Sequence, residues 1–252
     1  MGKRLKQQRR GSGSPAYRFP STIGRVNLTY RNYDDVEKTG VLRAKVLKFV
    51  DDAGRDSILM YVRYDNNEEG YLIAPEGIMV GSYVEVGAQA KLMLGSVLPL
   101  YRIPDGAYIY NIERNPGDGG RLVKAPGSYA NIVAKEGEYV YIKLPSKTTL
   151  ILNNECRAQL GVIAGGGRLE KPLMKAGNQA FKKLARHRYW PTNRGVHQSA
   201  YTHPHGGKQH HVGKSTVVAR SAPPGAKVGH IAARTTGRRS RHAKSKETEE
   251  SS

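Results

Sequence analysis

The sequence predicts a mainly β protein in which two small antiparallel barrels are flanked by long basic extensions. Two observations predict this fold: strand-like alternation is confined to the middle of the chain, and the charge is concentrated at its ends. The 252 residues carry 41 Lys and Arg against 21 Asp and Glu, a formal charge of +20 with His neutral. A compact chain of this charge repels itself unless a polyanion neutralises it, which indicates nucleic acid or an anionic membrane surface as the partner.

The membrane alternative finds little support in the sequence. No stretch approaches the roughly 18 apolar residues of a spanning helix, and the N-terminal region lacks the apolar block of a signal peptide. The single cysteine, Cys156, excludes an intrachain disulfide and fits a reducing compartment. We expect Cys156 to be a small buried hydrophobic residue rather than a reactive thiol.

The charge is unevenly distributed. Residues 1–35 contain eight basic and two acidic side chains, residues 161–252 contain eighteen and four, and residues 36–160 contain fifteen of each. The neutral middle can fold alone. The ends are rich in Gly, Pro and small polar residues, so they bury too little apolar surface to offset the loss of backbone entropy. We therefore expect the ends to become ordered only against a partner.

The first barrel is predicted from alternating β-branched, aromatic and polar residues that are interrupted by turn residues. The expected strands are 41–50, 57–64, 71–74 and 82–86, separated by segments rich in Asp, Asn, Glu and Gly.

The same pattern restarts after Gly95. The expected strands of the second unit are 108–112, 129–134, 138–144 and 148–152. Because each unit has only about 60 residues, a size at which a lone core is marginal, we expect the two units to share an interface.

One helix is predicted, over residues 177–188. It places Ala180 and Leu184, and with them Phe181, on one side, and basic side chains around the rest. Trp190, which follows the helix, is expected to fill a core because a lone tryptophan usually does so.

Two loops are candidates for RNA contacts. Residues 115–120, Asn-Pro-Gly-Asp-Gly-Gly, predict a tight turn first and an RNA-contact loop second. The glycines of residues 165–168 are either a flexible linker or an approach to phosphate, and they do not form a P-loop motif.

Four histidines lie close together at His203, His205, His210 and His211. They are compatible with a metal site or with a general base, but no cysteine or carboxylate lies nearby and no nucleophile with a partnered acid accompanies them. The third interpretation uses all the residues: Gly206 and Gly207 let the backbone approach a phosphate, while imidazoles stack on bases or donate to phosphate. This interpretation favours a loop folded onto RNA.

Seven strings in one order make the sequence more specific. They are Leu98-Pro99-Leu100, Pro116-Gly117-Asp118-Gly119-Gly120, Cys156-Arg157-Ala158-Gln159-Leu160-Gly161, Lys171-Pro172, Lys175-Ala176-Gly177-Asn178, Arg194-Gly195-Val196 and His203-Pro204-His205-Gly206-Gly207. Together they resemble the family of the universal large-subunit ribosomal protein two, and they are closer to its archaeal form than to its bacterial form.

The resemblance implies a mainly β fold: an OB-fold barrel followed by an SH3-like barrel, with long basic N- and C-terminal extensions that thread large-subunit (23S) rRNA. It also implies a place beneath the peptidyl-transferase region, near the bridges to the small subunit. The RNA catalyses peptide transfer there, so the protein is expected to be structural and not an enzyme. His203 and His205 approach the catalytic RNA by this resemblance.

One segment departs from the family pattern. Residues 197–202 replace a Met-Asn-containing run that usually precedes the histidines, and Lys208 stands where a third glycine is usual. Contacts made by the missing segment cannot be transferred to this chain. Lys208 is expected to add a phosphate contact in exchange for backbone freedom.

The expected domains are a basic N-terminal extension (1–35), an OB-fold RNA-binding domain (36–94), an SH3-like barrel (95–170) and a basic Gly/His-rich extension (171–252). The residues expected to bind RNA are Lys3, Arg4, Arg9, Arg10, Arg168, Lys175, Asn178, Lys182, Lys183, Arg186, Arg188, Arg194, His203, His205, Gly206, Gly207, Lys208, Arg220, Arg234, Arg238 and Arg239. No catalytic and no metal-binding residue is expected.

The expected partners are large-subunit rRNA and neighbouring ribosomal proteins, with contacts to the small subunit at the bridges. No membrane partner, no homo-oligomer and no cofactor other than Mg²⁺ bound to RNA is expected, and the location is the cytoplasmic ribosome. Two alternatives remain open: a His-dependent RNA-modifying or metal-binding enzyme, and a free RNA chaperone that is not part of ribosomes.

Overall fold

The protein is mainly β, as the sequence predicts. The computed structural model describes residues 4–15, 17–18, 26–52, 54–168, 170–185, 188–207 and 216–233. The chain divides into two compact units: residues 21–175, here the barrel unit, and residues 1–20 together with 176–252, here the extension unit.

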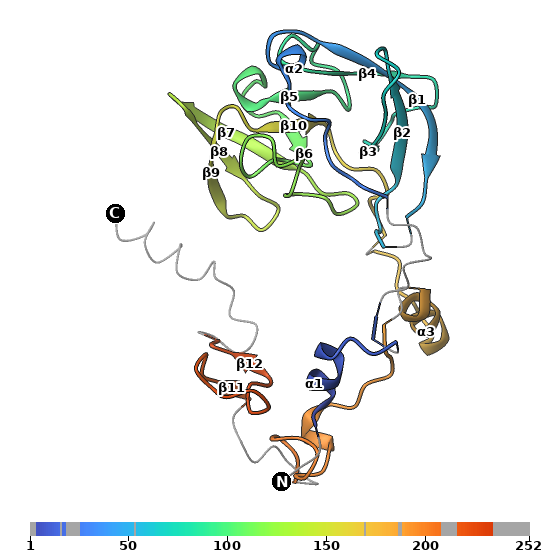
Figure 1. Ribbon diagram of the computed structural model, residues 1–252, viewed down its shortest axis with the longest axis vertical. Helices are drawn as coiled ribbons and strands as arrows, with labels where there is room; N and C mark the ends of the chain where they lie inside the picture. Colours follow the sequence, from blue (N-terminus) through green and yellow to red (C-terminus); the bar gives the residue numbers. More distant parts are fainter. Residues whose placement is uncertain are drawn as a thin grey trace. The chain divides into compact units, whose positions relative to one another are not determined.

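The barrel unit is built on one ten-stranded sheet in the order β3-β2-β1-β4-β5-β10-β6-β7-β8-β9. Figure 1 shows β1 to β4 on one side of β5 and β10, and β6 to β9 on the other. The strands are β1 (Leu42–Val50), β2 (Leu59–Tyr64), β3 (Glu69–Ile73), β4 (Tyr83–Val86), β5 (Val97–Pro99), β6 (Tyr108–Tyr110), β7 (Ala130–Glu136), β8 (Tyr139–Lys143), β9 (Thr149–Asn153) and β10 (Arg157–Leu160). The helices of this unit are the short α2 (Asp35–Thr39) and the 3₁₀ helix η1 (Leu100–Arg102).

Each half of the sheet encloses its own apolar core. Val46, Val62 and Val84 are fully buried in the first half, and Ile109 and Ile142 in the second. All the strands predicted for both halves are present, with ends that differ by up to two residues. Alternation predicts them because one face of each strand is buried and the other faces solvent.

The predicted interface between the two halves is confirmed. A third cluster of buried residues combines Leu59 and Ile73 from the first half with Tyr110 and Ile163 from the second. The halves are also joined through the backbone, because β4 and β5 pair in parallel where Val86 meets Val97, and β5 pairs antiparallel with β10.

The N-terminal part of the barrel unit lies in its core. Leu28 and Tyr30 are buried, and the Tyr30 hydroxyl donates to the Asn111 carbonyl at 2.5 Å. These residues fall inside the segment 1–35 that the sequence assigns to the N-terminal extension. The four domain limits themselves stay predictions.

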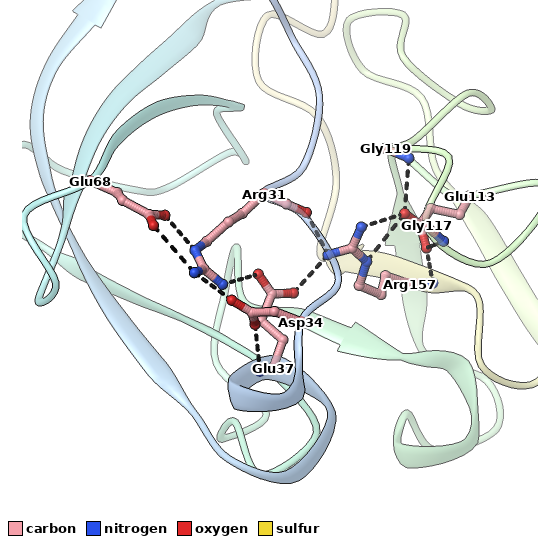
Figure 2. A network of polar contacts seen from close by, with 8 residues as sticks. All are labelled: Arg31, Asp34, Glu37, Glu68, Glu113, Gly117, Gly119 and Arg157. Atoms are coloured by element: carbon pink, nitrogen blue, oxygen red, sulfur yellow. Dashed lines mark hydrogen bonds and ion pairs between the residues drawn. The ribbon is translucent and has the colours of Figure 1, made fainter.

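A buried arginine connects the two halves (Figure 2). Arg157, 1% exposed, donates to Glu37 from α2 at 2.7 Å and to Glu113 from the loop after β6 at 2.7 Å. It also donates to the carbonyl of Arg31, whose own guanidinium pairs with Asp34 and Glu68. Two halves with separate cores are thus linked by one charged network.

The same network holds the turn at 115–120. The Glu113 carboxylate accepts hydrogen bonds from the backbone N–H groups of Gly117 (3.3 Å) and Gly119 (2.9 Å). Gly119 and Gly120 both have a φ near +80°, the left-handed region that glycine adopts without strain. The predicted tight turn is confirmed, and a buried carboxylate fixes its shape.

The described residues of the extension unit contain little regular structure. The elements among them are α1 (Lys6–Gly11), α3 (Ala176–Ala185), the 3₁₀ helix η2 (Gly195–His197) and a two-strand parallel ladder of β11 (Val217–Val218) and β12 (His230–Ile231). Helix α3 matches the predicted basic helix but ends at Ala185. Phe181 and Leu184 are exposed, whereas Lys182 and Lys183 are half-buried.

Cys156 and Trp190 give opposite outcomes. Cys156 is fully buried, and burial raises the pKa of its thiol to about 12, so the prediction of an inert buried residue is confirmed. The prediction that Trp190 fills a core is wrong, because its ring is 36% exposed. It lines an open cavity of the extension unit instead.

Candidate nucleic-acid interface

His203 is the centre of a folded loop in the extension unit. Its side chain is buried, and the backbone N–H of His205 donates to its Nδ1 at 3.1 Å. A neutral ring therefore carries its hydrogen on Nε2. Burial lowers the pKa of His203, and the neighbouring His205 lowers it further. The imidazole is thus held in its neutral form at pH 7.

Glycines let this loop pack closely around the imidazole. A Cβ on Gly195 would lie only 2.5 Å from Nδ1 of His203, and one on Gly229 would lie 2.8 Å from Cε1 of His205. Gly206 packs directly against the carbonyls of Gln198 and Ser199. None of these three positions has room for a larger residue.

Backbone hydrogen bonds close the loop. The N–H groups of Thr202 and His203 donate to the Ser199 carbonyl at 3.0 and 3.1 Å, and Gly206 donates to the His203 carbonyl at 3.0 Å. The N–H of Gly207 donates to the Gln198 carbonyl at 3.3 Å. The segment that departs from the family pattern therefore supplies two of these three acceptors, the carbonyls of Gln198 and Ser199.

The basic residues predicted to bind RNA fall into two groups by exposure. The exposed ones within the described ranges are Arg4, Arg9, Arg10, Lys175, Arg188, Arg194 and Arg220, and the polar Asn178 is exposed as well. Lys182 and Lys183 on α3 are half-buried. Lys3, Arg186, Lys208, Arg234, Arg238 and Arg239 lie outside the described residues.

Three arginines of this set have a local contact that bears on their charge. Arg168 pairs with Asp56 at 2.9 Å, so its guanidinium is partly neutralised within the barrel unit. The Arg194 guanidinium lies 2.5 Å from Nε2 of the exposed His197. Arg10 lies over the ring of Tyr17, with its Cζ 5.8 Å from the ring centroid. RNA contacts of the predicted residues remain predictions.

Sequence reasoning missed a basic aromatic face on the first half of the sheet. Tyr61 on β2 faces Tyr71 on β3 with the ring centroids 5.0 Å apart, and Lys48 on β1 places its Nζ 5.3 Å from the Tyr61 ring. Lys45 and Arg63 are exposed cross-strand partners, and Glu69 on β3 pairs with Arg63 at 2.9 Å and accepts from the Tyr61 hydroxyl. The signal was available, because these residues lie in the predicted strands 41–50, 57–64 and 71–74, on the face opposite the apolar one.

Aromatic rings beside cations form a surface on which single-stranded nucleic acid stacks. The first of the two small barrels carries this face, and the basic extension folds around a neutral histidine. Together these features define a nucleic-acid-binding class of protein. The comparisons with known proteins agree with this class. Residues 3–86 match the family model "Ribosomal Proteins L2, RNA binding N-terminal domain", and residues 93–228 match "Ribosomal Proteins L2, C-terminal domain".

The chain belongs to the ribosomal protein L2 family, and it is of the archaeal type. It is 48% identical to the large ribosomal subunit protein uL2 of Methanocaldococcus jannaschii over 239 residues, which cover 94% of this chain and 99% of that protein. Its identity is 48% to the uL2 of Methanococcus vannielii and 47% to that of Methanothermobacter thermautotrophicus, each over 240 residues and the full length of the relative. The two domains fit the predicted OB-fold and SH3-like barrels.

Two features of the described residues bear on the alternatives. They contain no group of three His, Cys, Asp or Glu side chains arranged to hold a metal ion, and His210 and His211 lie outside them. No helix in the same ranges is both long and apolar enough to cross a membrane.

Proposed function

We propose that the chain is a structural component of the large ribosomal subunit that binds large-subunit rRNA. The observation that carries this proposal is the identity of 47–48% over nearly the full length of this chain and of relatives named as large ribosomal subunit proteins. The charge of +20 and the basic aromatic face of the barrel unit supply the chemistry that RNA binding needs.

The barrel unit docks as a preformed body, and the extension unit follows the RNA. From Met1 to Pro20 and from Ala176 to Lys246 the sequence contains no Asp or Glu. Cations in these segments therefore have no acidic side chain of their own to pair with, and RNA phosphates are their natural counter-charge. Such an extension supports the peptidyl-transferase region by holding RNA in place, with bridge contacts to the small subunit as a further role.

In this proposal the protein catalyses nothing, because the RNA carries out the chemistry. The neutral, buried His203 organises its own loop, and no nucleophile hydrogen-bonds to it among the described residues. Any divalent ion in the complex is Mg²⁺ bound to RNA. The protein acts as one copy among neighbouring ribosomal proteins in the cytoplasm, away from membranes.

Sucrose-gradient sedimentation of a lysate tests the proposal directly. The tagged chain should move with large subunits and with whole ribosomes. A free RNA chaperone would stay in the light fractions, and that result would refute the proposal. Turnover of RNA by the isolated chain, or metal bound to it in a stoichiometric amount, would support the enzyme alternative.

The salt dependence of binding tests the electrostatic part. The logarithm of the binding constant for a large-subunit rRNA fragment should fall linearly with the logarithm of salt concentration, by about 0.7–0.9 per phosphate contacted. A flat response would contradict phosphate contacts by the extensions.

A further inference from the structure

The extension unit contains a cavity of 380 Å³ that combines aromatic and basic side chains. Its aromatic walls are Tyr17, Tyr189 and Trp190, and its cations are Arg10, Lys183 and Arg188. The volume lies within the roughly 300–1,000 Å³ of small-ligand pockets. The sequence-based list of RNA-binding residues includes the three cations but none of the aromatic rings.

The cavity is assembled from two distant parts of the chain. Arg10 belongs to α1 and Tyr17 follows it, whereas Lys183 lies on α3 and the remaining walls come directly after that helix. The Arg188 N–H donates to the Lys183 carbonyl at 2.8 Å and thereby turns the chain at the end of α3. The rings of Tyr17 and Tyr189 then meet at a centroid distance of 6.0 Å and an interplanar angle of 56°.

The rings of Tyr17 and Tyr189 are tilted and are not stacked face to face, and Arg10 lies over the Tyr17 ring with its Cζ 5.8 Å from the centroid. Tyr189 is 49% exposed and Trp190 is 36% exposed, so neither ring fills a core. Leaving large apolar rings partly in water costs free energy that burial would recover. A ligand with a flat face would recover it by stacking in the cavity.

The charges that line the cavity determine which groups a ligand must carry in addition to its flat face. Its lining contains no carboxylate, and the extension segments that build it contain none either before Glu247. A ligand therefore has to bring negative charge as well as a flat face. One unpaired nucleotide has both, since it joins an exposed base to phosphate groups.

We propose that this cavity captures one unpaired nucleotide of a single-stranded RNA segment, with the base against the aromatic walls and the adjoining phosphates on the cations. A paired base cannot enter, because its faces are stacked within the duplex. The inference rests on the proposed function, RNA binding, and adds to it a site and the state of the nucleotide that the site accepts.

Trp190 is the single tryptophan of the chain, so its fluorescence reports on the cavity without a label. The full-length protein is titrated with a short oligouridylate, with uridine monophosphate, with a blunt RNA duplex and with a polyglutamate peptide. Oligouridylate should quench Trp190 to saturation, and the mononucleotide should do so only at higher concentration because it has fewer phosphates. The duplex and the peptide should bind by charge and leave the fluorescence nearly unchanged.

Three variants locate the effect. Tyr189→Leu should weaken oligouridylate binding by roughly 5- to 150-fold, the range for loss of one base-stacking contact, while Tyr189→Phe should bind like the unmodified chain because it keeps the ring. Tyr201→Leu is the matched control, because Tyr201 is an exposed tyrosine of the same unit that does not line the cavity. It should leave binding and quenching unchanged. Recovery of binding by Tyr189→Phe separates loss of stacking from loss of folding.

Two outcomes would overturn the proposal. Equal quenching by polyglutamate and oligouridylate would show that the cavity responds to charge alone or accepts an acidic peptide. Equal affinity of Tyr189→Leu and Tyr201→Leu would show that the aromatic wall does not stack on a base. Neither result affects the test of the proposed function, which is sedimentation with large subunits. A chain that is quenched by oligouridylate but sediments alone would refute the proposed function and still support a nucleotide-binding cavity.

Discussion

The barrel unit and the extension unit solve the problem of positive charge in opposite ways. In the barrel unit, cations lie beside carboxylates: Arg157 pairs with Glu37 and Glu113, and Arg31 pairs with Asp34 and Glu68. In the extension unit, acidic residues are absent from the sequence until Glu247. The first unit is therefore self-sufficient, and the second is built to be neutralised by something else.

The two units also differ in what holds their backbones. The barrel unit uses strand pairing and three apolar clusters, so its shape follows from burial. The loop around His203 uses close packing of glycines against carbonyls and an imidazole. Packing of this kind fixes a shape with little apolar surface, but it tolerates almost no change at the glycine positions.

The largest expected effect is the loss of Arg157. In Arg157→Met, Glu37 and Glu113 would lose their shared partner while buried, and burial already raises the pKa of the Glu37 carboxyl. The free energy of unfolding of the barrel unit should fall by about 3–5 kcal/mol. Urea denaturation of the full chain measures this value.

Arg63→Met is the control for this change, because Arg63 and Glu69 form an ion pair in which both side chains are about half exposed. It should cost less than about 1 kcal/mol. Equal effects of the two variants would mean that the Arg157 network does not stabilise the barrel unit. The two units would then not differ in how their positive charge is neutralised.

Strain in the loop around His203 should give the next largest effect. In Gly195→Ala the new methyl group would overlap the His203 ring, which costs about 1–3 kcal/mol when neighbours must shift. Because the loop has to keep its shape to bind, affinity for a large-subunit rRNA fragment should fall roughly 5- to 150-fold. A filter-binding titration of the full chain measures the change.

Gly177→Ala provides the control within the same unit. Gly177 lies in α3 with open space around its missing Cβ, so the substitution should leave binding unchanged and raise helix stability by up to about 1 kcal/mol. If Gly195→Ala bound RNA as well as Gly177→Ala, the loop would not need the geometry described for it.

The difference between the units also explains how far the sequence could predict the structure. Strands such as 57–64 were predicted because one face is apolar and the other polar. Strand β10 was missed because its four residues, Arg157 to Leu160, are all buried and include Arg and Gln. Its polar groups are satisfied by partners far away in the sequence, which no local pattern reveals.

The site was predictable in composition and less so in geometry. The His-Pro-His-Gly-Gly string and the basic residues of the ends were recognised from the sequence. The burial of His203 depends on a contact with Gly195, eight residues earlier in the chain, which no periodic pattern of the sequence reveals. The cavity at Trp190 was missed because it joins residues near position 10 to residues near position 190, and the usual expectation for a lone tryptophan pointed to a core.

The smallest expected effect is the response of the extension unit to pH. The pKa of His203 is lowered in the folded loop from its ordinary value of 6.5, so the folded state binds fewer protons than the unfolded state. The stability that this group contributes is complete above about pH 6.5 and is lost as pH falls below that value toward the folded pKa. Titration by NMR should therefore show His203 protonating with a pKa below its ordinary value of 6.5. The protection factor of the Gly206 amide, which is bonded to the His203 carbonyl, should fall over the same interval, because protonation of the buried ring favours opening of the loop. The barrel unit contains no histidine, so the amides of β2 should show no matching change in their opening equilibrium. A His203 pKa at or above 6.5 would mean that the ring is solvated and that the loop is held by its glycines and backbone bonds alone.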